Sequence, residues 1–128
     1  MITALIYNAL DALHLAGGAW PAPLPKGKTV PSASYLLVSG PRDYTHGGAT
    51  GVARQRWQVN AVGKTFADAR DTADAVIPAM EALGSDADVS VRGCRLANER
   101  GPNFDAGANL WAVQMDFEVD YEPANATT

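Results

Sequence analysis

Two Gly-Lys-Thr triplets, at residues 27–29 and 63–65, are the parts of this sequence that most resemble a phosphate-binding loop. Such a loop needs a glycine five residues before its Gly-Lys pair, so that backbone amides can surround the phosphates. The corresponding positions here are Ala22 and Gln58. We therefore predict no nucleotide site at either triplet, and the sequence indicates no other cofactor.

The two histidines and the single cysteine are not expected to form a metal site. His14 and His46 lie 32 positions apart, and neither has a Cys, Asp or Glu partner at the spacing of zinc ligands. His46 could act as a base, but a histidine in a polar loop is usually solvated. Cys94 has no second cysteine to pair with, which fits a reducing compartment. Serine-nucleophile and zinc-protease motifs are absent, so we predict that the chain is not an enzyme.

Four carboxylates alternate along the last predicted strand: Asp116, Glu118, Asp120 and Glu122. A catalytic pair or a cation site needs carboxylates that converge from different elements, whereas alternate residues of one strand lie along a flat face. We interpret this stripe as a solvated or partner-facing surface of a sheet.

Composition indicates one globular domain, predicted to span residues 1–122 and to be followed by a frayed tail at 123–128. The chain has 128 residues, of which 47% are apolar and 19% charged. Its net charge of −4 argues against a protein that wraps nucleic acid. No apolar run approaches the roughly 18 residues that span a bilayer, so no membrane segment is expected. The apolar start of the chain lacks a basic region and is interpreted as mature structure.

Periodicity predicts the elements that must position these side chains. Apolar residues at the helical spacing predict helices over residues 2–13 and 65–83, the second with Thr65 as its N-cap. Proline density over 19–32 favours an extended surface segment. Strands are predicted over 35–39, 52–62, 89–97 and 110–122, with long loops over 40–51 and 98–107.

Strict alternation over 110–122 indicates an antiparallel sheet with one covered face, since a parallel strand buried on both sides would be apolar throughout. The predicted fold class is α+β: a single domain of order α-β-β-α-β-β, with a four-stranded antiparallel sheet and both helices on one face. Trp57 and Trp111 are predicted core residues, while Trp20 in the proline-rich segment could anchor an interface.

Several segments, in this order, resemble the tail-completion, or tail-terminator, family of long-tailed bacteriophages and gene transfer agents. The resemblance covers nearly the full length of the chain. The segments are 31–35 (Pro-Ser-Ala-Ser-Tyr), 39–44 (Ser-Gly-Pro-Arg-Asp-Tyr), 56–59 (Arg-Trp-Gln-Val), 65–69 (Thr-Phe-Ala-Asp-Ala), 91–93 (Val-Arg-Gly) and 111–117 (Trp-Ala-Val-Gln-Met-Asp-Phe).

The resemblance implies a small α/β structural protein of the virion that assembles with itself into a ring, usually a hexamer. That ring caps the finished tail tube, stops its polymerisation and docks to the head connector. The implied partners are the tail tube protein and the head–tail connector or neck proteins, and DNA passes through the ring without sequence-specific binding. The expected location is the head-proximal end of the tail, and the host cytoplasm during assembly. A head-completion or neck protein and a small ligand-binding module remain as alternatives.

The candidate interface residues lie in the proline-rich segment 19–32, in the loop 40–51 and on the charged faces of the strands: Trp20, Arg42, Asp43, Tyr44, Arg54, Arg56, Asp116, Glu118 and Asp120. Residues 1–63 carry five basic and two acidic side chains, whereas residues 64–128 carry five basic and twelve acidic ones. These opposite charges could pair between neighbouring copies, which would make assembly sensitive to salt, or across strands of one chain. The glycine-rich loop 40–51 is expected to be mobile until it contacts a neighbour.

Overall fold

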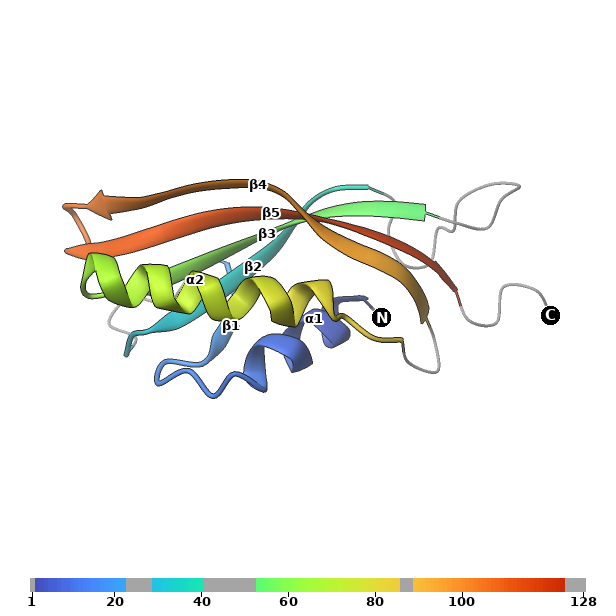
Figure 1. Cartoon of the computed structure of the whole chain (residues 1–128), viewed down its shortest axis with the longest axis horizontal. Coiled ribbons are helices and arrows are strands. Elements are labelled where there is room, and N and C mark those ends of the chain that lie inside the picture. Colours follow the sequence, from blue (N-terminus) through green and yellow to red (C-terminus); the bar gives the residue numbers. More distant parts are fainter. Residues whose placement is uncertain (1, 23–28, 41–52, 86–88, 124–128) are drawn as a thin grey trace.

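The computed structural model describes residues 2–22, 29–40, 53–85 and 89–123. Its helices and strands are, in chain order, α1 (Ile2–Asp11), β1 (Ala19–Pro21), β2 (Ser32–Ser39), β3 (Ala53–Gly63), α2 (Phe66–Glu81), β4 (Val89–Asp105) and β5 (Leu110–Pro123). The strands form one sheet in the order β1-β2-β3-β5-β4, and both helices cover the same face of it (Figure 1). The predicted α+β class with one sheet is confirmed, and its details differ in three places.

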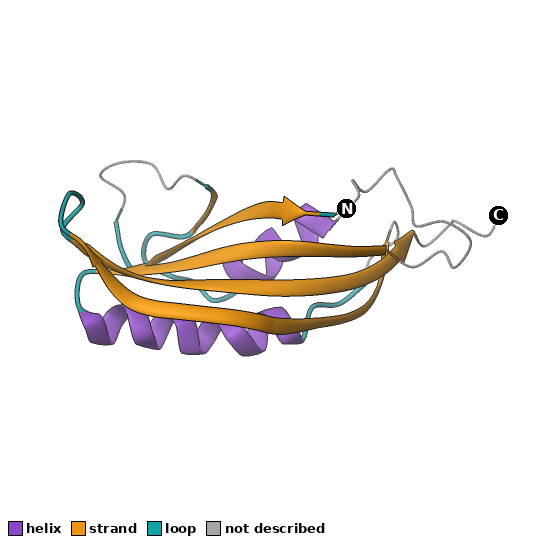
Figure 2. Cartoon of the chain, turned by 90° about the horizontal axis from the view of Figure 1, so that it is seen from above, coloured by secondary structure: helices purple, strands orange, loops and turns teal. Residues whose placement is uncertain are grey.

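Strand β5 supplies the centre of the core, as its alternation predicts. It lies between β3 and β4 and is antiparallel to both. Its helix-facing side chains are completely buried: Val113, Met115, Phe117, Val119 and Tyr121. Buried side chains of α1 and α2 pack against them, so the sheet and the helices share one hydrophobic layer. Figure 2 shows α2 running along the strands of the sheet. Trp57 on β3 is buried in the same layer, which confirms its predicted place.

Helix α2 begins where its capping sequence predicts. The Thr65 hydroxyl oxygen accepts a hydrogen bond from the Asp68 backbone N–H at 3.0 Å, which satisfies one of the free donors of the first turn. The helix continues through Pro78 to Glu81. Its inner face buries small and medium side chains, including Ala69, Ala73 and Val76. These short side chains let the helix axis lie close to the sheet.

The first correction is a fifth strand, so the sheet is mixed. Residues 19–21, predicted to belong to an extended surface segment and to no strand, form β1 and pair in parallel with residues 33–35 of β2. Backbone hydrogen bonds from Ala33 N to Gly18 O (3.1 Å) and from Ala22 N to Tyr35 O (2.9 Å) flank this pairing. A proline is tolerated here because β1 is short and lies at the sheet edge. Strand β2 also begins at Ser32, three residues earlier than predicted.

The second correction concerns residues 98–105, which the sequence predicts to be a polar loop. They continue β4, so that this strand runs for 17 residues and pairs with β5 as far as Asp105 opposite Leu110. The pairing register shifts at three places along it. These residues belong to an edge strand and are mostly exposed, so their polar composition reflects exposure and not a loop.

The third correction is Trp111, which is only partly buried although its neighbours on the same face of β5 are fully buried. The predicted loop 40–51, beyond Gly40, and the tail 124–128 lie outside the described residues. Neither helix in the described ranges is long and apolar enough to cross a membrane.

Candidate functional site

The sheet face away from the helices carries the charged residues singled out from the sequence. The carboxylates of β5 lie between arginines of the two neighbouring strands. On the β3 side, Arg54 Nε donates to Asp120 Oδ1 at 2.7 Å. Arg56 donates to Asp116 Oδ2 at 3.1 Å and to Glu118 Oε2 at 3.5 Å. The register explains these contacts, because it places Arg54 opposite Asp120 and Arg56 opposite Glu118.

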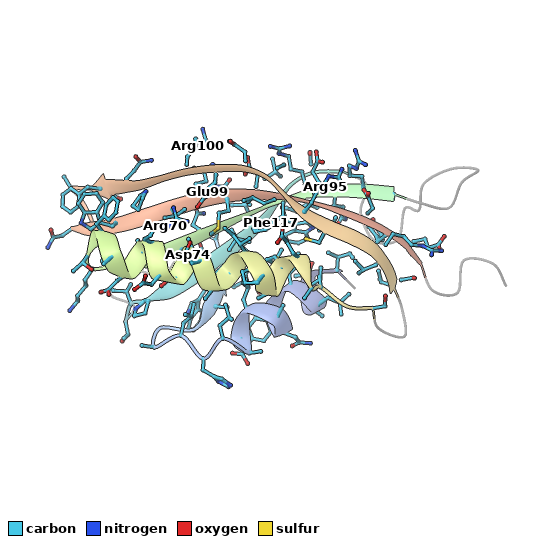
Figure 3. All side chains as sticks on the ribbon, in the orientation of Figure 1. Arg70, Asp74, Arg95, Glu99, Arg100 and Phe117 are labelled. Atoms are coloured by element: carbon cyan, nitrogen blue, oxygen red, sulfur yellow. The ribbon has the colours of Figure 1, made fainter. Side chains whose placement is uncertain are left out.

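On the β4 side, two further arginines bond the same row of carboxylates. Arg95 donates to Glu118 Oε1 at 2.7 Å and to Asp120 Oδ2 at 3.3 Å, and Arg92 forms an ion pair with Glu122. Figure 3 shows Arg95 on the face away from the helices, while Phe117 lies between the sheet and α2. The four arginines balance the four carboxylates, and we call these eight residues the charge ladder.

The opposite charges of the sequence could pair between copies or across the strands of one chain. The charge ladder is the second arrangement. Carboxylate side chains are more covered than the arginines above them: Asp116 is 14% exposed, whereas Arg54 is 57% exposed. Exposed ion pairs contribute only about 0.2–1 kcal/mol each. The charge ladder therefore contributes little to the stability of the fold. A role of these residues between copies remains a prediction.

Replacing Asp120 by asparagine is expected to make the free energy of unfolding less dependent on pH in the acid range. Hydrogen bonding from Arg54, with Arg95 as a second donor, lowers the pKa of the Asp120 carboxyl against the opposing effect of its burial. A lowered folded-state pKa contributes stability above the unfolded value, near pH 4, and that contribution is lost as the pH falls through the folded pKa. The free energy of unfolding, measured with urea between about pH 5 and about pH 2, should thus differ less between wild type and variant at the acid end. A difference that stays constant with pH would contradict this account.

A separate set of ion pairs joins α2 to the extended part of β4. Arg70 bonds Asp74 one turn along the helix, at 2.9 Å, and also pairs with Glu99 on β4. Figure 3 shows these three side chains between the helix and the strand. The contact fixes the position of β4 where its sequence becomes polar.

Trp20 lies in β1 and is half-buried, so only part of its side chain is available to a partner. Its indole Nε1 donates to the Gly17 carbonyl oxygen at 2.6 Å and thereby holds the turn before β1. Arg42, Asp43, Tyr44 and His46 lie outside the described residues. The structure thus gathers five of the nine candidate interface residues on one face, together with Arg92, Arg95 and Glu122.

The residues considered for chemistry do not converge. Lys64 is exposed in the turn between β3 and α2, and His14 is exposed after the end of α1. Gly63 has a packing reason to be glycine: a Cβ there would lie 2.7 Å from the backbone N of Ala69. Among the described residues, no three His, Cys, Asp or Glu side chains lie close enough together to hold a metal. Burial raises the pKa of the Cys94 thiol to about 12, which makes it a poor nucleophile.

One surface was missed by the sequence analysis. Phe66, Phe104 and Trp111 meet at the tip of the β4–β5 hairpin. Phe104 falls in the segment predicted to be a loop, and Trp111 is a predicted core residue. The signal that could have found it is a lone aromatic residue in an otherwise polar stretch.

Comparison with known proteins gives a likeness of fold. No protein-family model matches the sequence, and no curated protein matches it. Among solved structures, the chain is similar to a chain described as "Virion of native gene transfer agent (GTA) particle", with a TM-score of 0.67 and 18% sequence identity. The likeness covers 94% of this chain and 94% of that chain. At this level of identity the comparison shows a shared fold over nearly the whole length.

Proposed function

We propose that this protein is a structural component of a phage-like particle, and that within it the protein is the tail terminator. The observation that carries the proposal is the fold shared with a virion chain over 94% of both lengths. The resemblance of the sequence to the tail-completion family supports the finer assignment. Several of the resembling segments lie in the sheet, at residues 56–59 of β3, 91–93 of β4 and 111–117 of β5.

In this role the protein acts through shape and surface. Copies assemble into a ring, which we expect to be a hexamer, on the end of the tail tube. The ring stops growth of the tube and offers the head connector a docking surface, and DNA passes through it without sequence-specific contacts. The charge ladder suits a surface protein of this kind, because in-chain pairing gives a polar sheet face without a large net charge.

Deletion of the gene in a particle-producing strain tests the role. If the protein is the terminator, electron microscopy should show tail tubes of uncontrolled length and filled heads without tails. Complementation with Lys64→Ala or Asp116→Ala should restore complete particles, because an architectural role does not depend on one polar side chain. Asp116 is mostly covered, whereas the sequence predicts a solvated or partner-facing position. Its replacement by alanine still leaves Arg56 with a second partner, Glu118.

Three other outcomes would change the assignment. Tails of normal length beside heads that have lost their DNA would indicate the head-completion or neck alternative. Complete particles in the deletion strain would contradict a structural role in the virion. A folded Lys64→Ala variant that fails to restore particles would point to a specific site at that residue.

A further inference from the structure

The two halves of β4 are held to the fold unequally. In the first half, residues 89–96, one side chain is buried and three more pack against the core: Val89, and Val91, Cys94 and Leu96. Residues 98–105 continue the edge strand to the turn of the β4–β5 hairpin and include no buried side chain. We call residues 98–105 the strap. Segments with few buried contacts open more readily than the rest of a domain.

The pairing of the strap with β5 is interrupted at two places. Ala97, directly before the strap, has no residue opposite it on β5. Inside the strap, residues 101–102 together stand opposite the single residue Val113. Extra residues of this kind disrupt the ladder of backbone hydrogen bonds, and Pro102 has no N–H group to donate. The strap is therefore separated from the first half of β4 by one irregularity and divided by a second.

Two side-chain contacts hold the strap to the rest of the molecule, one on each side of residues 101–102. Glu99 pairs with Arg70 of α2 (Figure 3). The ring centroid of Phe104 is 5.2 Å from that of Trp111 on β5. Among the described residues, no other ion pair or side-chain hydrogen bond links the strap to another element. The strap therefore depends on these two contacts and on its backbone bonds to β5.

Arg70 does not become unpaired when Glu99 leaves it. Its guanidinium also bonds the carboxylate of Asp74, one turn along α2, at 2.9 Å. A half-covered charge that lost every partner would destabilise the fold, but Asp74 stays beside Arg70 on the same helix. The Glu99 side chain is 27% exposed in the closed strap and becomes hydrated when the strap opens. The Arg70–Glu99 pair can therefore break and form again while α2 stays folded.

We propose that the strap opens from β5 as one unit while the rest of the fold stays closed, and that the Arg70–Glu99 pair is its salt-sensitive latch. Both side chains of the pair are partly exposed, so dissolved ions reach them. The screening length falls to about 3 Å at 1 M salt, which weakens the attraction between the two charges.

Opening of the strap changes which backbone groups of β5 are accessible. In the closed form, the strap pairs with β5 from Asp116 to Leu110. When the strap leaves, this edge of β5 has unpaired N–H and C=O groups, which can pair with a strand of another molecule. The closed strap thus keeps the edge covered, and the Arg70–Glu99 pair controls how often it is uncovered. This behaviour belongs to the single chain and is independent of the proposed role in a particle.

Amide hydrogen exchange of the purified protein, followed residue by residue by NMR, tests the proposal. In the wild type, the strap amides that bond β5 should exchange at similar rates, about tenfold or more faster than the bonded amides of residues 89–96. Glu99→Gln should raise exchange in the strap by about 2- to 5-fold, the effect of a partly exposed ion pair, and leave residues 89–96 unchanged. About 1 M salt should raise strap exchange in the wild type and have almost no effect in Glu99→Gln.

Glu122→Gln is the matched control. Glu122 is 23% exposed and pairs with Arg92 at the other end of β4, so the same substitution breaks a similar ion pair outside the strap. It should leave exchange in the strap unchanged. Circular dichroism checks that each variant is folded, and Arg70→Gln, which removes the latch from the helix side, replaces Glu99→Gln if that variant is not.

Three results would overturn the proposal. The first is a wild type whose bonded strap amides exchange as slowly as those of residues 89–96, which would mean that the strap does not open by itself. The second is an equal effect of Glu99→Gln and Glu122→Gln on the strap. The third is a salt effect on the strap that persists in Glu99→Gln. The proposed function is judged separately by the tails of the deletion strain, so either can fail alone.

Discussion

Replacing Phe117 by alanine is expected to lower the free energy of unfolding by about 3–5 kcal/mol, the usual loss when a buried aromatic side chain is removed. Phe117 is completely buried on the central strand β5, where it lies opposite Trp57 of β3 and Leu96 of β4. Strands on both sides and helices beneath prevent the surroundings from closing the space that the ring leaves. Urea unfolding followed by tryptophan fluorescence measures the change. In particle assembly the variant should fail because it does not stay folded.

Phe104→Ala is the matched control for this prediction. It removes the same side chain from the same sheet, but from a position that is 48% exposed. Its main loss is the ring contact with Trp111, worth about 0.5–1.5 kcal/mol. A loss for Phe117→Ala no larger than that for Phe104→Ala would mean that the core does not lie between β5 and the helices.

Replacing Gly63 by alanine is expected to cost about 1–3 kcal/mol, although only one methyl group is added. A Cβ at this position would lie 2.7 Å from both the backbone N and the side-chain Cβ of its nearest neighbours, Ala69 and Asp68 respectively. The first turn of α2 therefore packs directly onto the end of β3. To accommodate the methyl group, the helix must move away from the sheet, and its buried face loses contact.

Gly84→Ala is the control, because a Cβ there has no atom within 4 Å, and its effect should be within about 0.5 kcal/mol of zero. Lys64→Ala, next to Gly63 but exposed, should be equally mild. This comparison separates the two explanations for the Gly-Lys-Thr triplet. Equal effects at Gly63 and Gly84 would remove the packing explanation and reopen the question of a ligand at the triplet.

The sequence predicts correctly those elements whose signal is local. Alternation along β3 and β5 identifies which side chains are buried, because the strand pleat sends successive side chains to opposite faces. The apolar spacing and the Thr65 cap place α2 to within a residue of its start, since both depend on the geometry of one helical turn. These two signals are enough for the α+β class and for the core around Phe117.

Features that depend on the neighbours of a strand were decided only by the tertiary structure. Residues 19–21 become a strand because the edge of β2 is available, and residues 98–105 become one because β5 continues beside them. Their own proline and polar residues predict neither outcome. The partners of Arg54 and Arg56 follow from the same cause: composition shows opposite charges, and only the β3–β5 register pairs them within one chain. Trp111 has the alternation of a core residue, yet it lies beside the first residue of α2, where Phe66 and Phe104 form a surface with it.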